Sequence, residues 1–411
     1  MTGIAKLRRH RRSVVIAAAL LAALGTTAAP AQADQGRWAA VWGAAAQPAV
    51  PTADWYGVNW SEQGFTDDSV RQVVRLTGGG TRIRIRLSNI YGTKPLHIAG
   101  AMVGYAGIGA AVEAGSLRTL RFGGTDATVV PPGREIVSDA TPFRTSTGDR
   151  VAVTLRLDAP TGPATFHHFA MTTSYRAPGD HLDDTGATAF TQHSDSWYYL
   201  TGVETSGRAH RGTVVAFGDS LTDGVGSTKG ADARYPDRLA ERLEAAGLPR
   251  SVVNAGIGGN RVLTDSPIYG EHALTRFSRD VLARPGVRSV IILDGVNDLA
   301  AWNETGPVTC AQIIDGHRTL IRLAHARGLR VIGATITPMG ASAAYSPDGE
   351  RIRQQVNHWI RTSGEYDAVV DFDRIVANSD RIRAAYDSGD HIHLNDAGYR
   401  AVADAVDLDA L

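Results

Sequence analysis

The chain has 411 residues, of which 43% are hydrophobic and 20% are charged. These proportions are typical of a globular protein and argue against a disordered or fibrous one. The 42 Lys and Arg residues balance the 42 Asp and Glu residues, so the formal net charge is zero. This balance argues against nucleic acid or an anionic membrane surface as the main partner. A chain of this length exceeds one ordinary domain, and we expect two.

Residues 1–33 have the pattern of an export signal. The basic stretch KLRRHRRS precedes the apolar run VVIAAALLAALG, and Ala31-Gln32-Ala33 offers a small-residue cleavage site. The apolar run is shorter than the ~20 residues that span a bilayer, which favours a cleaved signal peptide over a membrane anchor. No later segment is apolar enough to span a membrane. We therefore expect a secreted, extracellular protein without stable membrane insertion, exported by either the general or the twin-arginine route.

Residues 34–205 are predicted to form an all-β domain. In residues 81–89, TRIRIRLSN, isoleucines and a leucine alternate with arginines, and residues 149–162, DRVAVTLRLDAPTG, repeat this period of two. We expect residues 70–76, VRQVVRL, to pair with residues 81–89 across a glycine turn. Short strands with frequent Gly and Pro, uninterrupted by a long helical period, predict an antiparallel sandwich of jelly-roll type.

Residues 206–411 show a different pattern, in which short apolar runs alternate with helical periods. The runs rich in β-branched residues are TVVAF (213–217), SVVNAG (251–256), SVIILDG (289–295), RVIGATI (330–336) and AVVDFD (368–373). The helical patterns between and after them cover residues 235–247, 311–328, 350–364 and 396–406. Such a succession predicts an α/β domain with a parallel five-stranded sheet between helices and right-handed crossovers.

Cys310 is the only cysteine of the chain, so no intramolecular disulfide can form. It stands at the start of the helical pattern that begins near residue 311, and no histidine motif accompanies it. We expect a buried structural residue rather than a nucleophile.

Polar and glycine residues follow three of these strands. The first strand ends on Gly218-Asp219-Ser220, the second on the stretch NAGIGGN (254–260), and the third on GVND (295–298). A late loop, DHIHLN (390–395), leads into the final helix. Because ligands bind beyond the carboxyl ends of the strands in open parallel sheets, we expect these four segments to meet in one site.

The four segments contain the groups that acyl transfer needs. A serine hydroxyl such as that of Ser220 becomes a nucleophile when a base takes its proton, and His393 has a suitable side chain. Asp390 precedes His393 by three residues, a spacing that lets it orient the imidazole. The amides of Ser220 and Gly259 and the side-chain amide of Asn297 are candidate donors for an oxyanion hole.

Over roughly residues 210–411 the chain resembles the SGNH hydrolase (GDSL esterase/lipase) family. The resemblance is carried by four blocks in order: FGDSL with Ser220, NAGIGGN with Gly259, DGVND with Asn297, and DHIHLN with Asp390 and His393. It implies a serine nucleophile, a histidine base with an aspartate partner, an oxyanion hole completed by Gly and Asn, and no metal or organic cofactor. Residues 34–205 resemble the β-sandwich that precedes such domains in some secreted bacterial esterases.

Two positions depart from the usual family pattern. His391 stands where a small residue is more usual, and Leu394 stands where Pro is common. His391 and His393 could be read as a metal pair, but a metal site needs a third ligand and no suitable spacing presents one. We therefore expect no metal, and we expect His391 to line the entrance of the site.

Other polar residues are interpreted as structural. Asp219 and Asp298 are expected to hold their loops by accepting hydrogen bonds from backbone amides. The four histidines of the first domain, His167, His168, His181 and His193, are expected to be scattered packing or surface residues rather than metal ligands. The aromatic run at residues 197–199 is expected in the core rather than as a sugar-stacking platform.

These expectations lead to an extracellular serine esterase that acts on a small-molecule or polysaccharide ester, with deacylation, in particular deacetylation, of a carbohydrate as the favoured reaction. A lipase or broad-specificity carboxylesterase is the alternative enzyme. An alternative of another class is a polysaccharide- or wall-binding protein whose hydrolase half is catalytically vestigial. The oligomeric state and the role of the first domain stay open.

Overall fold

The computed structural model describes residues 1–2, 38–52, 57–207, 212–303 and 306–411. The predicted signal peptide, residues 1–33, lies outside the described residues apart from its first two. In the described part of the chain, no helix combines the length and the apolar character needed to cross a membrane.

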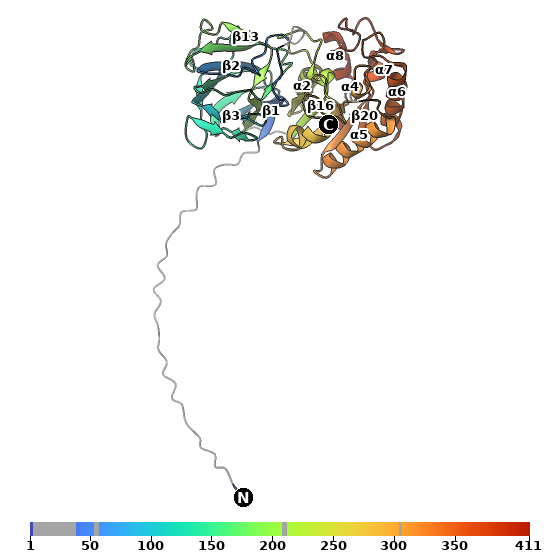
Figure 1. Ribbon diagram of the computed structural model, residues 1–411, viewed down its shortest axis with the longest axis horizontal. Coiled ribbons are helices and arrows are strands. Elements are labelled where there is room, and N and C mark those ends of the chain that lie inside the picture. Colours follow the sequence, from blue (N-terminus) through green and yellow to red (C-terminus); the bar gives the residue numbers. More distant parts are fainter. Residues whose placement is uncertain (3–37, 53–56, 208–211, 304–305) are drawn as a thin grey trace. The chain divides into compact units, whose positions relative to one another are not determined.

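The region up to residue 207 is built from antiparallel strands, which run from blue to green in Figure 1. The strands are β1 (Ala39–Gly43), β2 (Asp68–Arg75), β3 (Gly80–Ser88), β4 (Leu96–Ile98), β5 (Gly100–Tyr105), β6 (Arg118–Leu120), β7 (Thr128–Val130), β8 (Glu135–Val137), β9 (Thr141–Thr145), β10 (Arg150–Leu157), β11 (Phe166–His167), β12 (Ser174–Pro178), β13 (Gln192–Ser194), β14 (Trp197–Tyr198) and β15 (Leu200–Ser206). One sheet has the order β1-β15-β3-β8, with β9 also paired to β3, and a second has the order β13-β12-β2-β10-β5-β6. The antiparallel region predicted from the sequence is confirmed, and its jelly-roll connectivity stays a prediction.

The alternation seen in the sequence divides each strand into a core face and an outer face. Ile83 and Ile85 of β3 are fully buried, and they share one hydrophobic cluster with Val153 and Leu155 of β10 in the other sheet. The arginines that alternate with these isoleucines in β3, Arg82, Arg84 and Arg86, remain partly exposed. Trp197, Tyr198 and Tyr199 are at most 2% exposed, which confirms their predicted place in the core.

The partner predicted for residues 81–89 is wrong. β2, which contains most of residues 70–76, pairs with β10 and β12, while β3 pairs with β15, β8 and β9. The segment between β2 and β3 crosses from one sheet to the other. The amide of Leu76 still donates to the carbonyl of Asp149, whereas the amide of the next residue, Thr77, donates to Val41 of β1. The glycine-rich turn therefore joins two sheets instead of forming a hairpin.

The region from residue 212 onward is an α/β fold. Its elements are β16 (Gly212–Gly218), α1 (Ser220–Asp223), α2 (Tyr235–Ala245), β17 (Arg250–Gly256), α3 (Ala273–Phe277), a π-helical turn (Ser278–Leu282), β18 (Val287–Leu293), α4 (Val296–Leu299), α5 (Cys310–His325), β19 (Arg330–Ala334), α6 (Pro347–Thr362), β20 (Ala368–Val370), α7 (Phe372–Val376), β21 (Ala377–Asn378), β22 (Arg381–Ile382), α8 (Asp396–Asp404) and a 3₁₀ turn (Leu408–Ala410). The sheet is parallel with the order β17-β16-β18-β19-β20, as predicted. Since the chain reverses its direction of winding beside β16, the residues that follow β16 and β18 lie at a topological switch point.

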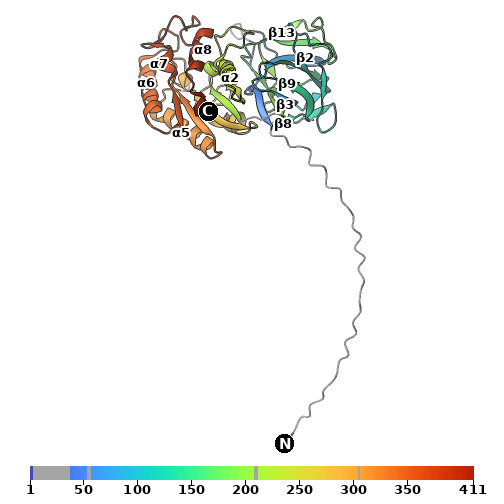
Figure 2. The ribbon, with the colours of Figure 1, turned by 180° about the vertical axis from the view of Figure 1, so that it is seen from behind.

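Local signals begin the long helices, which Figure 2 shows from behind. Thr309 caps α5, and its side chain and that of Gln312 bond reciprocally to each other's backbone amides. Ser346 caps α6, and Pro347 fills the first helical position. Cys310 starts α5 as expected, but it is partly exposed rather than buried.

The two regions pack into one compact unit, Gly36–Leu411. β1 of the antiparallel region packs against β17, an edge strand of the parallel sheet. The carbonyl of Ala40 in β1 accepts a hydrogen bond from the hydroxyl of Ser251, 2.6 Å. The division into domains at residue 206 stays a prediction.

The buried hydroxyl of Thr77 also joins the two regions. It accepts from the amide of Val252 in β17 at 3.0 Å, and it lies 2.7 Å from the carbonyls of Val41 and Val252. We expect Thr77→Val to lower the free energy of unfolding by about 1–3 kcal/mol, because a buried amide loses its acceptor. Urea denaturation measures this loss. Thr119→Val, at an exposed position of β6, serves as the control and should change the value by less than about 0.5 kcal/mol; equal effects of the two substitutions would contradict the argument.

Candidate active site

Ser220 stands on a tight turn between β16 and α1. The strand ends at Gly218, and the Asp219 carboxylate caps α1 by accepting from the amide of Leu221 at 3.0 Å. Gly224 closes α1 with φ +103°, a left-handed conformation that glycine adopts without strain. The turn raises Ser220 at the carboxyl end of its strand, and the residue is 6% exposed. The predicted role of Asp219 in holding its loop is confirmed.

The loop before α8 brings a histidine and an aspartate to this serine. His393 Nε2 lies 2.8 Å from Ser220 Oγ, and His393 Nδ1 lies 2.6 Å from an oxygen of Asp390. A carboxylate oxygen accepts, so Nδ1 carries the hydrogen and Nε2 is left to accept from the serine hydroxyl. The structure therefore brings together the three residues predicted as nucleophile, base and orienting acid.

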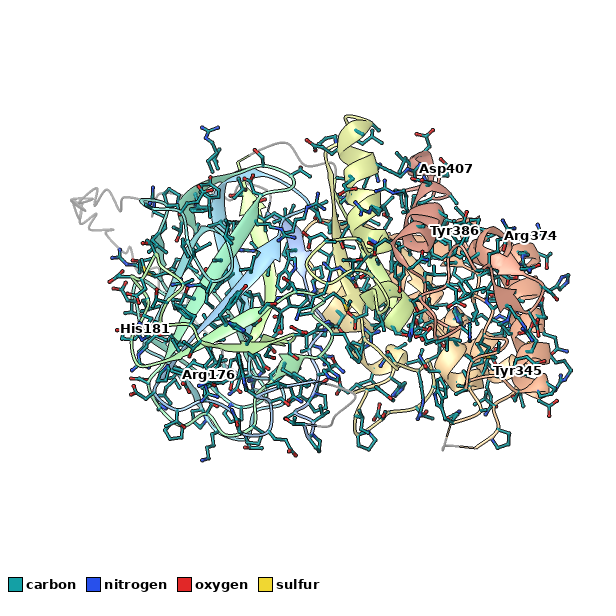
Figure 3. The ribbon with its side chains drawn as sticks, turned by 90° about the horizontal axis from the view of Figure 1, so that it is seen from above. Arg176, His181, Tyr345, Arg374, Tyr386 and Asp407 are labelled. Carbon is teal, nitrogen blue, oxygen red and sulfur yellow. The ribbon has the colours of Figure 1, made fainter. Side chains whose placement is uncertain are left out.

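Backbone amides fix Asp390 within its loop. Its second oxygen accepts from the amides of Ile392 and His393 at 3.1 and 2.9 Å and from the Ser388 hydroxyl at 3.0 Å. Burial alone would raise the pKa of the Asp390 carboxyl, but the hydrogen bond and charge of His393 together with these amides hold that pKa well below its usual range. Asp390 thus stays ionised. Tyr386, just before this loop, lies beside α8 (Figure 3), and its carbonyl accepts from the amide of Asn395 at the helix cap.

The stretch after β17 supplies the glycine predicted for the oxyanion hole. Gly259 has φ +76°, and a Cβ on it would come 2.3 Å from the ring of Tyr269. Both facts restrict the position to glycine. The preceding amide, that of Gly258, donates to the Asp223 carboxylate at 2.9 Å. We use the name oxyanion loop for residues 256–263.

Asn297 reaches the same loop from α4. Its side-chain nitrogen donates to the carbonyl of Asn260 at 2.9 Å, and the residue is 5% exposed. One of its two amide hydrogens is used in this bond, which leaves the second as a further donor. The next residue, Asp298, accepts from the amides of Val262 and Leu263 at 2.8 and 3.1 Å. Its predicted role in holding a loop is confirmed, and it ties the oxyanion loop to α4.

The second histidine of the late loop has a separate partner. His391 Nδ1 lies 2.6 Å from Asp387, and the residue has φ +68°, which is uncommon outside glycine. Among the residues that the structure describes, no group of three or more His, Cys, Asp or Glu side chains could hold a metal ion. The predicted place of His391 at the entrance of the site stays a prediction.

Two contributions to this site escaped the sequence analysis. His167 of β11 lies 3.0 Å from Asp223 of α1, a pair buried on both sides. Arg276 of α3, which is fully buried, donates to the carbonyls of Gly218 and Ala255 at the ends of β16 and β17. Neither pairing has a spacing signal, because the partners come together only in the tertiary fold.

Three carboxyls are buried around the switch point. Burial raises the pKa of Asp219, opposed by the amide of Leu221, and burial together with the charges of Asp219 and Asp298 raises the pKa of Asp294 well above its ordinary value. Burial likewise raises the pKa of Asp298 to about 6, against the amides that bond to it. One oxygen of Asp294 has no hydrogen-bond partner among the described residues. The charge of Asp298 disfavours ionisation of Asp219, and the charges of both disfavour ionisation of Asp294.

A family model described as the GDSL-like lipase/acylhydrolase family matches residues 216–401. The hydrolase region of the chain belongs to this family. The protein is thus an SGNH ester hydrolase with an antiparallel β region ahead of its family domain.

Solved structures similar to this SGNH hydrolase cover about half of the chain. The aryl esterase of M. smegmatis is 19% identical over 47% of this chain and 95% of its own, with a TM-score of 0.40. A carbohydrate acetylesterase family member from Sinorhizobium meliloti is 16% identical over 47% and 94%, with a TM-score of 0.39. A GDSL-like lipase from Bacteroides thetaiotaomicron is 18% identical over 49% and 88%, with a TM-score of 0.37. A comparison with curated proteins finds no match.

The raised pKa of Asp219 implies that the free energy of unfolding depends on pH. The folded state binds this proton more tightly than the unfolded state, so stability from this group falls as pH rises from about 4 through the folded pKa, and stays low above it. Asp219→Asn keeps the cap to Leu221 without the charge. We expect its free energy of unfolding at pH 8.5 to exceed that of the unmodified protein by about 1–2 kcal/mol, with a smaller difference at pH 5.

Urea denaturation at the two pH values measures this difference. Asp126→Asn is the matched control, because Asp126 is 60% exposed and pairs with Arg121 on the surface. Such a pair contributes less than about 1 kcal/mol at either pH. An Asp219→Asn variant that is less stable than the unmodified protein at pH 8.5 would contradict the assigned direction of the pKa shift.

Proposed function

We propose that this SGNH hydrolase is an extracellular serine esterase with Ser220 as nucleophile, His393 as general base and Asp390 as the residue that orients His393. The observation that carries the proposal is the hydrogen-bonded series from Asp390 through His393 to Ser220, with contacts of 2.6 and 2.8 Å. Such a series lowers the cost of removing the serine proton at the moment of attack.

The reaction follows in two stages. Ser220 Oγ attacks the ester carbonyl while its proton moves to His393 Nε2, and the resulting imidazolium is stabilised by the ionised Asp390. His393 then protonates the leaving alcohol as the carbon–oxygen bond of the ester breaks. In the second stage a water molecule attacks the acyl-serine, His393 takes its proton and returns it to Ser220, and the carboxylic acid leaves.

The negative charge on the carbonyl oxygen needs fixed donors. The proposal assigns this task to the amides of Ser220 and Gly259 and to the side-chain amide of Asn297. Support comes from the short α1 turn, the left-handed Gly259 and the bond that holds Asn297 to the oxyanion loop. Because these donors are fixed before substrate binds, they require little reorganisation in the transition state.

The proposed substrate is a carbohydrate ester with a short acyl group, acetyl in particular. Ser220 is 6% exposed, and the His393 side chain is 16% exposed. Tyr269 packs against Gly259, so the space beside the oxyanion donors is limited. Limited space favours a small acyl group over a long chain. A lipase or broad carboxylesterase is the alternative, and it requires a wider apolar groove.

Two further parts of the proposal concern the first 205 residues. Secretion is supported by the basic and apolar pattern of residues 1–33. A sandwich of jelly-roll type for the antiparallel region is supported by its two principal sheets and their shared hydrophobic cluster.

Ser220→Ala should remove the nucleophile while leaving the fold intact. We expect kcat for p-nitrophenyl acetate to fall by at least about 10³-fold, since the nucleophile and its base act as a unit. Circular dichroism and a thermal melt establish that the variant is folded. A folded variant that keeps its turnover would exclude Ser220 as the nucleophile.

A panel of p-nitrophenyl esters of rising chain length, together with acetylated xylan and pectin, separates the candidate functions. We expect the highest kcat/KM for acetyl esters, and release of acetate from at least one polysaccharide. Preference for long chains would instead support the lipase. Glycan binding without turnover of any ester would support the vestigial binding protein.

A further inference from the structure

Asp223 connects the serine turn to the oxyanion loop. It is the last residue of α1, the helix that Ser220 begins, and it is 1% exposed. One carboxylate oxygen accepts from the amide of Gly258 at 2.9 Å. The other lies 3.0 Å from His167 Nε2. A single buried carboxylate therefore connects the serine turn and the oxyanion loop to the antiparallel region.

The partners of His167 identify its protonation state. Its Nε2 faces the Asp223 carboxylate, and its Nδ1 lies 2.9 Å from the carbonyl of Ala45. Both partners accept hydrogen bonds, so both ring nitrogens donate and the ring is an imidazolium. Burial alone would lower the pKa of His167, but the charge and hydrogen bond of Asp223 raise it above the ordinary value. The pair is a buried ion pair between the two regions.

The loop that this pair anchors has little rigidity of its own. Gly258 and Gly259 are adjacent glycines, and without a Cβ neither residue restricts its own backbone angles. Besides the bond to Asp223, Gly258 is confined by Phe169, since a Cβ on Gly258 would come 2.4 Å from that ring. Phe169 and His167 belong to the same segment of the antiparallel region. This segment thus holds Gly258 by a hydrogen bond relayed through Asp223 and by direct packing.

We propose that His167 is a positioning residue for ester hydrolysis: through Asp223 it fixes the peptide of Gly258 and thereby aims the amide of Gly259 at the oxyanion. The inference rests on the proposed serine esterase function. It assigns the antiparallel region a part in catalysis, because that region supplies the positive charge that keeps Asp223 in place. Arg234 is a further cation near Asp223, and two of its side-chain nitrogens donate to Asp237.

The test compares His167→Phe, Asp223→Ala and the double variant with p-nitrophenyl acetate as substrate. We expect each single variant to lower kcat by about 10- to 100-fold with KM changed less than threefold, since a misplaced oxyanion donor acts in the transition state. The double variant should lose no more than about threefold beyond either single one, because both act through the same bond. Additive losses would overturn the proposal.

A readout that reports the oxyanion site directly is binding of phenylboronic acid, which forms a tetrahedral adduct with a reactive serine. Its affinity should fall in parallel with kcat in His167→Phe. Thr77→Val is the matched control: it also removes a buried hydrogen bond between the two regions, but it touches neither the serine turn nor the oxyanion loop. It should keep the kcat and the boronate affinity of the unmodified protein. Unchanged kcat in folded His167→Phe would overturn the proposal.

His167→Gln keeps the measurement decisive if the phenylalanine variant does not fold. The side-chain NH2 group of glutamine can still donate to Asp223, but it carries no positive charge. We therefore expect a kcat lowered by about 3- to 10-fold with KM unchanged. A kcat equal to that of the unmodified protein would overturn the proposal. Failure of the proposed function itself is recognised separately: Ser220→Ala would then keep its activity. Loss of activity in Ser220→Ala with full activity in the His167 variants rejects only the role of His167.

Discussion

The site depends on one buried guanidinium, that of Arg276. Its nitrogens donate to the carbonyl of Gly218 at the end of β16 and to that of Ala255 near the end of β17, each at 2.7 Å, and to Asn260 in the oxyanion loop at 2.8 Å. Burying a guanidinium is costly unless its donors are satisfied, so this arrangement tolerates little displacement. Burial lowers the pKa of Arg276, and the neighbouring Asp280 opposes that effect. The ends of β16 and β17 are therefore held in a fixed position relative to each other. This in turn fixes where the serine turn and the oxyanion loop begin.

The loops beyond these strand ends are held by carboxylates rather than by apolar packing alone. Asp223 and Asp298 each bond to amides of the oxyanion loop, at Gly258 and at Val262 and Leu263. Burial favours the protonated form of Asp298, whereas its use as an acceptor of two amides favours the ionised form. The site thus maintains buried charge at some expense of stability, and in return its polar groups are oriented before substrate arrives.

The hydrolase region could be predicted closely from the sequence because its signals are local. Each buried parallel strand is a continuous run of β-branched residues, and Ser220 and Asn297 are recognisable because each lies just beyond such a run. The antiparallel region was predicted less completely. Its alternating strands were recognised, but the pairing of β2 with β10 and β12 depends on contacts between distant segments. His167 was missed for the same reason: its meaning comes from Asp223, 56 positions away, and from no pattern around it.

The antiparallel region contacts the hydrolase region at the edge of the parallel sheet and at Asp223. β17 is an edge strand, and an uncovered edge invites pairing with other chains. β1 packs along it, and the hydroxyls of Thr213 and Ser251 both reach the carbonyl of Ala40. The same region supplies His167 to Asp223 deep in the interface. Separation of the two regions would uncover the sheet edge and would remove the His167 side chain from Asp223. Because β1 and His167 belong to the same region, the covering of the sheet edge and the proposed support of the oxyanion loop depend on one interface.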